Sequence, residues 1–312
     1  MANLSTVDDM PNVTANFSDE VYQHNESFYE RLFLEFFTVV GLLSEAANII
    51  FIITIAKNKK LREDVSNVIF LHVNIIQAIY LLATPLTFRI SMSFFHVSQI
   101  HAIVLCLTYQ VEFNMMFGIT WFHILVICDW YLKLYHEDTY QKFCRIYKFF
   151  IIMLYVVMLM GCSITVHYCL NHQMLAVTYM FMFIGVHLLA TTLVIVNVVH
   201  LFKKRRILGG RKGTNGLAIT NIFFILWSGV LVLLFLEFIG LKMYAPVFVI
   251  FLCVLGFSSP VFNLIYLYYC DDYYRVFLRQ VIKCERNRYS NEGLESPAVR
   301  YQNVNSVAVS ET

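Results

Sequence analysis

The stretch of residues 100–137, IHAIVLCLTYQVEFNMMFGITWFHILVICDWYLKLYHE, decides the fold. It is apolar over residues 100–128 and then changes to charged and aromatic residues. A helix needs about 20 mostly apolar residues to cross the hydrocarbon core of a bilayer, so this run is long enough to span one. The change of character at Asp129 therefore predicts the point at which a membrane helix meets water.

The composition of the whole chain supports a membrane protein. The 312 residues are 59% hydrophobic and 16% aromatic but only 14% charged. A chain with so few charged residues has too little polar surface to cover a soluble globule of this size. The net charge of +2 is the sum of unevenly placed charges and gives no indication of nucleic-acid binding.

Seven apolar stretches predict an all-α membrane protein, a bundle of seven transmembrane helices. The stretches are 36–56, 65–88, 100–128, 149–166, 175–201, 217–241 and 246–269. A transmembrane barrel would instead show short segments of alternating hydrophobicity, which these long runs exclude. We expect an N-terminal segment at 1–31, the bundle at 32–270, an amphipathic helix at 271–284 and a disordered tail at 285–312.

Basic residues predict the orientation, because Lys and Arg remain on the cytoplasmic side during insertion. They concentrate after the first, third, fifth and seventh stretches, at Lys57, Lys59, Lys60, Arg62, Lys133, Lys142, Arg145, Lys148, the 203–206 run, Arg211, Lys212, Arg275, Arg279 and Lys283. This places the N-terminus outside and the C-terminus inside. Four N-glycosylation sequons before the first stretch agree with it; their asparagines are Asn3, Asn12, Asn16 and Asn25.

Cysteine positions fit the same topology. Cys106 is near the outer end of the third stretch and Cys169 lies just beyond the outer end of the fourth. Both are on the oxidising side, so a disulfide between them is sterically reasonable and would tie the second outer loop to the bundle. Cys270 and Cys284 are predicted to be cytoplasmic and near the membrane, where a fatty acyl chain can be attached.

Together, these features resemble the rhodopsin-like (class A) G-protein-coupled receptors. Asp129-Trp130-Tyr131 falls where that family carries Asp/Glu-Arg-Tyr at the inner end of the third helix. Trp130 replaces the arginine and cannot donate its forked hydrogen bonds. The alternative interpretation is an aromatic belt at the membrane interface with Asp129 solvated. We favour the family motif, because other landmarks agree with its position.

The sixth and seventh stretches carry further family landmarks. Phe223 to Gly229 resembles Phe-x-x-Cys-Trp-x-Pro, which implies that Trp227 is a toggle at the pocket floor; an ordinary core tryptophan is the alternative. Gly229 replaces the kinking proline and gives softness without an enforced kink.

Asn263 and Tyr274 align with the family's Asn-Pro-x-x-Tyr asparagine and the Phe of its following Phe-Arg. Pro260, one turn earlier, can supply the kink that is missing after Asn263. The segment after Tyr269 has the pattern of an amphipathic helix on the inner leaflet, and Cys284, at its end, is the expected palmitoylation site.

Polar residues within apolar spans usually face the bundle interior. Asn48, Asn74, Gln77 and Asn263 occupy the region where the family builds a polar cluster around a sodium-binding aspartate. An amide lacks the charge that holds a hard cation, so we expect weak or absent sodium sensitivity.

Two acids are candidates for the ligand side. Glu112 falls at the level where amine-binding members of the family place an aspartate, and Glu237 lies in the outer part of the sixth stretch. A cationic ligand is one physical solution for a buried carboxylate. An internal ion pair between Glu112 and Arg89 is the alternative, and intramembrane acids often pair in this way.

The sequence therefore predicts a plasma-membrane receptor that passes an extracellular ligand signal to a heterotrimeric G protein. It predicts no enzyme, cofactor, metal site or nucleic-acid partner; the seventh stretch has no lysine for a retinal Schiff base. Basic inner loops suit a G protein and anionic membrane lipid equally. An atypical receptor that binds ligand without signalling remains open because of Trp130. A seven-span transporter is less favoured, since no internal repeat is seen.

Overall fold

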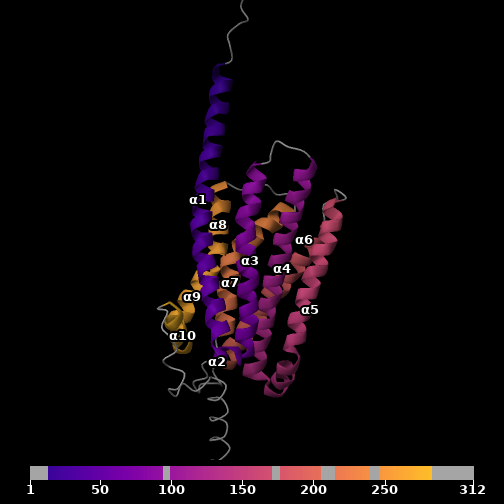
Figure 1. Cartoon of the computed structure of the whole chain (residues 1–312), viewed down its shortest axis with the longest axis vertical. Helices are drawn as coiled ribbons and strands as arrows, with labels where there is room; N and C mark the ends of the chain where they lie inside the picture. Colours follow the sequence, from indigo (N-terminus) through magenta and orange to yellow (C-terminus); the bar gives the residue numbers. More distant parts are fainter. Residues whose placement is uncertain (1–12, 94–98, 171–175, 205–214, 239–245, 283–312) are drawn as a thin grey trace, which may run out of the picture.

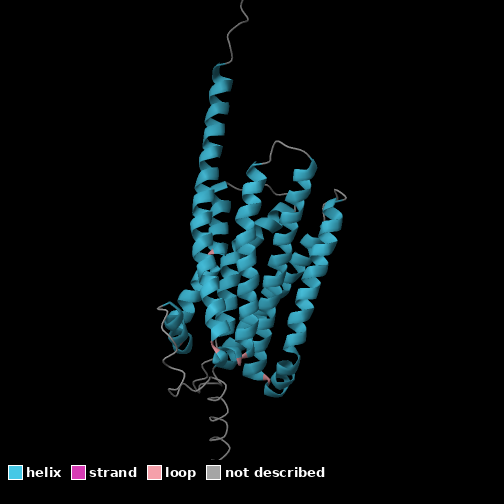
Figure 2. Ribbon diagram, viewed as in Figure 1, coloured by secondary structure: helices cyan, strands magenta, loops and turns pink. Residues whose placement is uncertain are grey.

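The computed structural model describes residues 13–93, 99–170, 176–204, 215–238 and 246–282, and in these ranges all of the regular structure is helical (Figures 1 and 2). The helices are α1 Val13–Lys57, α2 Lys59–Arg62, α3 Val65–Ser93, α4 Gln99–Tyr135, α5 Glu137–Leu170, α6 Ala176–Lys204, α7 Asn215–Phe238, α8 Pro246–Phe257, α9 Ser259–Cys270 and α10 Asp272–Ile282. Among the described residues, six helices are long and apolar enough to cross a membrane, or seven if α8 and α9 form one bent span. The chain is a multi-pass helical membrane protein.

Helix α4 lies at the centre of the bundle, where it packs against α3, α5, α6 and α7. Helix α1 packs on the other side of α3 and also contacts α8, α9 and α10 (Figure 1). Half of the apolar segment of α4 is buried inside the bundle, whereas only 11% of the apolar segment of α5 is buried. The outer faces of α5 and α6 are apolar and exposed, as in Leu159 and Ile195, so these faces are suited to lipid.

Small residues and paired polar groups hold the helices close together. A β-carbon added at Gly185 of α6 would lie 3.2 Å from Nε1 of Trp121 on α4, so the two backbones approach closely there. Nδ1 of His72 on α3 and the hydroxyl of Tyr155 on α5 are 2.9 Å apart. Such polar pairs contribute about 0.6 kcal/mol each on average within membranes, so close packing supplies most of the rest.

Several helices extend beyond the apolar stretches that predicted them. Helix α4 continues from the predicted end at residue 128 to Tyr135, and α5 begins at Glu137 although its apolar stretch begins at 149. Helix α1 begins at Val13, within the segment predicted to precede the bundle. The physical reason is that apolarity marks where a helix can contact lipid, whereas backbone hydrogen bonds continue for as long as the chain remains helical.

The seventh apolar stretch is divided between α8 and α9, which meet at Ser258 with a bend of 46°. Pro260 follows in the first turn of α9, where its missing N–H is tolerated. The bend lies two residues before Pro260, the residue that can supply a kink in this stretch. Ser44 of α1 donates a hydrogen bond of 2.6 Å to the carbonyl oxygen of Phe257, which is the last residue of α8. This contact joins α1 to the bend.

Candidate functional site

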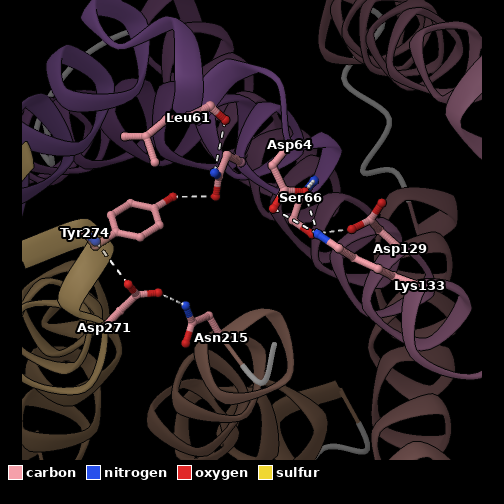
Figure 3. A network of polar contacts seen from close by, with 9 residues as sticks. Leu61, Asp64, Ser66, Asp129, Lys133, Asn215, Asp271 and Tyr274 are labelled. Atoms are coloured by element: carbon pink, nitrogen blue, oxygen red, sulfur yellow. Dashed lines mark hydrogen bonds and ion pairs between the residues drawn. The ribbon is translucent and has the colours of Figure 1, made fainter. Parts of the chain in front are cut away.

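At one end of the bundle lie α2, the C-terminal part of α4, the first turn of α7, and α10 (Figure 1). These elements carry Lys59, Lys60, Arg62, Lys133 and Arg275, so we call it the basic end. Asp129 of α4 is fully buried at this end, and its Oδ2 accepts a hydrogen bond from the hydroxyl of Ser66 on α3 (Figure 3). A buried acid needs hydrogen-bond partners; Ser66 supplies one to Oδ2, while Oδ1 has none among the described residues.

Lys133 lies one turn after Asp129 and forms an ion pair with Asp64. Its Nζ is 3.0 Å from both carboxylate oxygens of Asp64, and the two side chains are 24% and 20% exposed. Asp64 immediately precedes α3, and its Oδ1 also accepts the backbone N–H of Ser66 at 3.3 Å. Asp64 is therefore the N-cap of α3 and at the same time an anchor for α4.

Asp271 has the same double role between α9 and α10. Its Oδ1 accepts the backbone N–H of Tyr274 at 3.0 Å, which makes Asp271 the N-cap of α10. Its Oδ2 accepts a hydrogen bond from the side-chain amide of Asn215, the first residue of α7 (Figure 3). One carboxylate thus connects the start of α7 to the junction of α9 and α10.

Tyr274 connects α10 to α3. It is 4% exposed, and its hydroxyl donates a 2.6 Å hydrogen bond to Oδ1 of Asn67. Nδ2 of Asn67 donates in turn to the carbonyl oxygen of Leu61 at 3.0 Å. The sequence comparison aligned Tyr274 with an aromatic position of the receptor family. In the structure its ring is buried in the core, and its hydroxyl joins α10 to α3.

Trp130 lies at the junction of α4, α6 and α7. It is 3% exposed, and its ring centroid is 5.3 Å from that of His200 on α6. The hydroxyl of Tyr135 is 3.0 Å from Nδ1 of His200, which fixes the imidazole against the indole. On the opposite side, a β-carbon added at Gly216 of α7 would lie 3.3 Å from Cβ of Trp130.

These positions correct the interfacial-belt interpretation of Asp129-Trp130. A belt would leave the tryptophan at the lipid–water boundary and the acid solvated, but both side chains are buried between helices. The apolar run ends at residue 128, whereas the first turns of α3 and α7 and the last turns of α6 still pack around α4 at that level. Tyr131, on another face of α4, is half-buried and contacts the rings of Tyr135 and His136.

In the interior, Trp227 is 2% exposed and packs edge-on against Phe257, with ring centroids 5.3 Å apart. Its Nε1 donates to the hydroxyl of Ser259 at 3.4 Å, and Nε2 of Gln77 donates to the same hydroxyl at 2.9 Å. Ser259 therefore joins α3 and α7 to α9. No sequence pattern pointed to Ser259 beyond its place before Pro260.

Two residues near Trp227 were also predicted from the sequence. Phe223, one turn earlier, stacks on His123 of α4 with a centroid distance of 4.0 Å. Helix α7 is continuous through Gly229, as expected for glycine in place of proline. A β-carbon at Gly229 would lie 2.5 Å from Cδ2 of Leu252, so the glycine also allows α8 to approach α7.

The predicted polar core is buried but is not connected by hydrogen bonds among its four amides. Nδ2 of Asn74 donates to the carbonyl oxygen of Phe70 at 2.6 Å, within its own helix. Among the described residues, the side-chain oxygen and nitrogen of Asn48 have no hydrogen-bond partner. The same holds for Oδ1 of Asn263. Gln77 is the member that reaches another helix, through Ser259.

Several residues that the sequence predicted to be functional lie away from the basic end or outside the residues that the structure describes. Glu112 is half-buried on α4, while the side chains of Arg89 on α3 and Glu237 on α7 lie outside the described residues. The backbones of Asn16 and Asn25 belong to α1; their side chains, and the whole of Asn3, Asn12 and Cys284, also lie outside them. Cys106 and Cys169 form a disulfide bond with a Cα–Cα distance of 5.8 Å, as predicted.

The arrangement at the basic end joins helices through buried polar and aromatic contacts. Among the residues that the structure describes, no group of three His, Cys, Asp or Glu side chains could hold a metal ion. Sequence reasoning missed Asp64, Ser66, Asn67, Asn215 and Asp271. A signal existed for the two aspartates, because each immediately precedes a helix in the N-cap position.

Comparisons with known proteins identify no family for this chain. No family model matches the chain, and no curated protein is similar to it at a significant level. The fold and the basic end therefore define the class of protein, a multi-pass helical membrane protein whose helix ends are joined by buried polar and aromatic contacts.

Proposed function

We propose that the protein is a seven-helix receptor that passes a signal from an extracellular ligand to a heterotrimeric G protein. In this proposal α8 and α9 form one bent seventh span, α10 is an eighth helix at the membrane surface, and the basic end faces the cytoplasm. The chain lies in the plasma membrane with its sequons outside, and anionic lipid and the G protein both contact the basic end.

The observation that carries the proposal is the burial of Asp129 and Trp130 where α3, α4, α6 and α7 meet. A receptor of this class needs a junction that closes its inner end at rest and opens when a ligand favours another state. A ligand shifts such an equilibrium only by its difference in affinity for the two states. Both residues are positioned to change partners if α6 and α7 move away from α4.

Features of α10 support an eighth helix at the membrane surface. Tyr274 and Leu278 are buried against the bundle, one turn apart. Arg275 donates through Nε to the carbonyl oxygen of Tyr268 at 2.9 Å and through Nη2 to that of Tyr269 at 3.1 Å. A cation at the C-terminal carbonyls of a helix is favourable, so Arg275 fixes α10 at an angle to α9.

A receptor that binds ligand without signalling is the second candidate, and Trp130 is the observation that favours it. An arginine at this position could extend donors into a cleft, whereas Nε1 of Trp130 has no hydrogen-bond partner among the described residues and the ring fills the junction. The two candidates differ in whether the opened end activates a G protein.

The test is nucleotide exchange on a panel of purified heterotrimers, with the protein in lipid nanodiscs. We expect measurable ligand-free exchange on at least one heterotrimer and faster exchange with Trp130→Arg. Tyr131→Arg is the matched control, because it adds the same charge one residue away. Failure of both the natural chain and Trp130→Arg on every heterotrimer would refute signalling in favour of the second candidate.

The orientation has a separate test. Epitope tags at the two termini should be accessible from opposite sides of intact cells, and removing the four sequon asparagines should increase electrophoretic mobility. Tags accessible from one side only would refute the seven-span topology and, with it, the receptor proposal.

A further inference from the structure

At the basic end, α7 begins with two contacts that depend on its first two residues. The amide of Asn215 donates to Oδ2 of Asp271, whose other oxygen is already fixed by the N–H of Tyr274 (Figure 3). Because Asp271 belongs to the junction of α9 and α10, this side-chain hydrogen bond ties the first turn of α7 to that junction.

The second contact requires glycine at position 216. A β-carbon there would lie 3.2 Å from Cγ1 of Val126 and 3.3 Å from Cβ of Trp130, distances that force neighbouring atoms to shift. Val126 and Trp130 are four residues apart, so they form one ridge on α4. The absence of a side chain at Gly216 is what lets this ridge approach the backbone of α7.

Trp130 also contacts α6, and α6 is joined to α7. Nδ2 of Asn197 donates to Oδ1 of Asn221 at 3.0 Å, and Nδ2 of Asn221 donates back to Oδ1 of Asn197 at 3.2 Å. This reciprocal amide pair links the two helices about one and a half turns above the start of α7. It favours a movement in which the inner parts of α6 and α7 shift together.

We propose that Trp130 is a wedge that closes the basic end against both α6 and α7, and that the Asn215–Asp271 hydrogen bond is the latch that keeps α7 seated on it. Moving the α6–α7 pair away from α4 separates Trp130 from His200 and Gly216 and breaks the latch. The inference rests on the proposed function for its consequence, since this opening is what would admit a G protein, but the movement itself can be measured without one.

The experiment measures the distance between spin labels at Lys142 of α5 and Ile225 of α7, which are exposed side chains. It uses the full chain in nanodiscs with the free cysteines replaced. Asn215→Ala removes the latch, and we expect the ratio of open to closed populations to rise about fivefold, the factor that corresponds to one hydrogen bond. Asp271→Asn should act in the same direction, because its one amide oxygen cannot accept from both Tyr274 and Asn215.

Gly216→Ala tests the wedge. We expect a longer-distance population, and we expect Val126→Ala in the same chain to reverse part of it by removing the closest atom. Gly41→Ala is the matched control, since a β-carbon there would have no atom within 4 Å. Heat-denaturation midpoints near that of the natural chain establish that each variant is folded.

An unchanged distance distribution in both folded variants, Asn215→Ala and Gly216→Ala, would overturn the inference. Exchange on the heterotrimer panel then separates the two proposals. Longer distances with faster exchange support both proposals, whereas longer distances without any exchange support the latch and refute signalling through a G protein.

Discussion

Removing the hydroxyl of Ser66 gives the sharpest test of the buried acid at the basic end. Ser66→Ala leaves Oδ2 of the fully buried Asp129 without the donor that the structure provides. A buried hydrogen-bonding group left without its partner costs about 1–3 kcal/mol, so we expect a loss of about 2 kcal/mol in stability. At about 2.1 cal/mol/K of unfolding entropy per residue, this corresponds to a fall of about 3 °C in the midpoint of heat denaturation for the 312-residue chain.

The assay is heat denaturation of the purified protein in nanodiscs at neutral pH. Ser163→Ala is the matched control, because its hydroxyl donates to the carbonyl oxygen of Leu159 within α5 and is exposed. The control should change the midpoint little. Asp129→Leu completes a double-mutant cycle, in which Ser66→Ala should cost much less once its partner is apolar. Equal shifts in Ser66→Ala and Ser163→Ala would refute the reasoning.

Four other features of the chain can be tested by substitution or by a change of solution. Tyr274→Phe should cost about 1 kcal/mol in unfolding experiments, since it removes only the hydroxyl that bonds to α3. Gly256→Ala should cost about 1–3 kcal/mol and alter tryptophan fluorescence, because a β-carbon would lie 3.1 Å from the rigid ring of Trp227; an unchanged spectrum and midpoint would contradict it. Cys106→Ser should lower the midpoint as much as reduction of the natural chain does, with a cost of about 2–4 kcal/mol. Replacing sodium by a bulky organic cation should leave the midpoint unchanged, because Gln77 lacks the charge that holds the ion.

The sequence predicted contacts that depend on local pattern. The lengths of the apolar stretches predicted six helices that are long and apolar enough to cross a membrane, and the seventh stretch forms the bent pair α8 and α9. Pro260, which can supply a kink, lies in the first turn after the bend. The pairing of Cys106 with Cys169 followed from the topology, since only a few cysteines can share one side of a membrane.

The residues that contact Asp129 and Trp130 could not be predicted from a local sequence pattern. The four-residue spacing of Asp129 and Lys133 places them on one face of α4, but it does not say which helix that face meets. Ser66 is 63 residues from Asp129, and Asn215 is 56 residues from Asp271. Contacts over such separations depend on how the helices cross, which no local pattern records.

The sequence by itself therefore determined which segments enter the membrane and where the chain bends, because hydrophobic length and backbone chemistry act locally. Only the tertiary structure decided that Asp129 and Trp130 lie inside the bundle and not at its surface. Apolarity ends at residue 128, yet the first turns of α3 and α7 and the last turns of α6 pack around α4 at this level and cover both side chains. Burial depends on these neighbours, and so does the closure of the basic end.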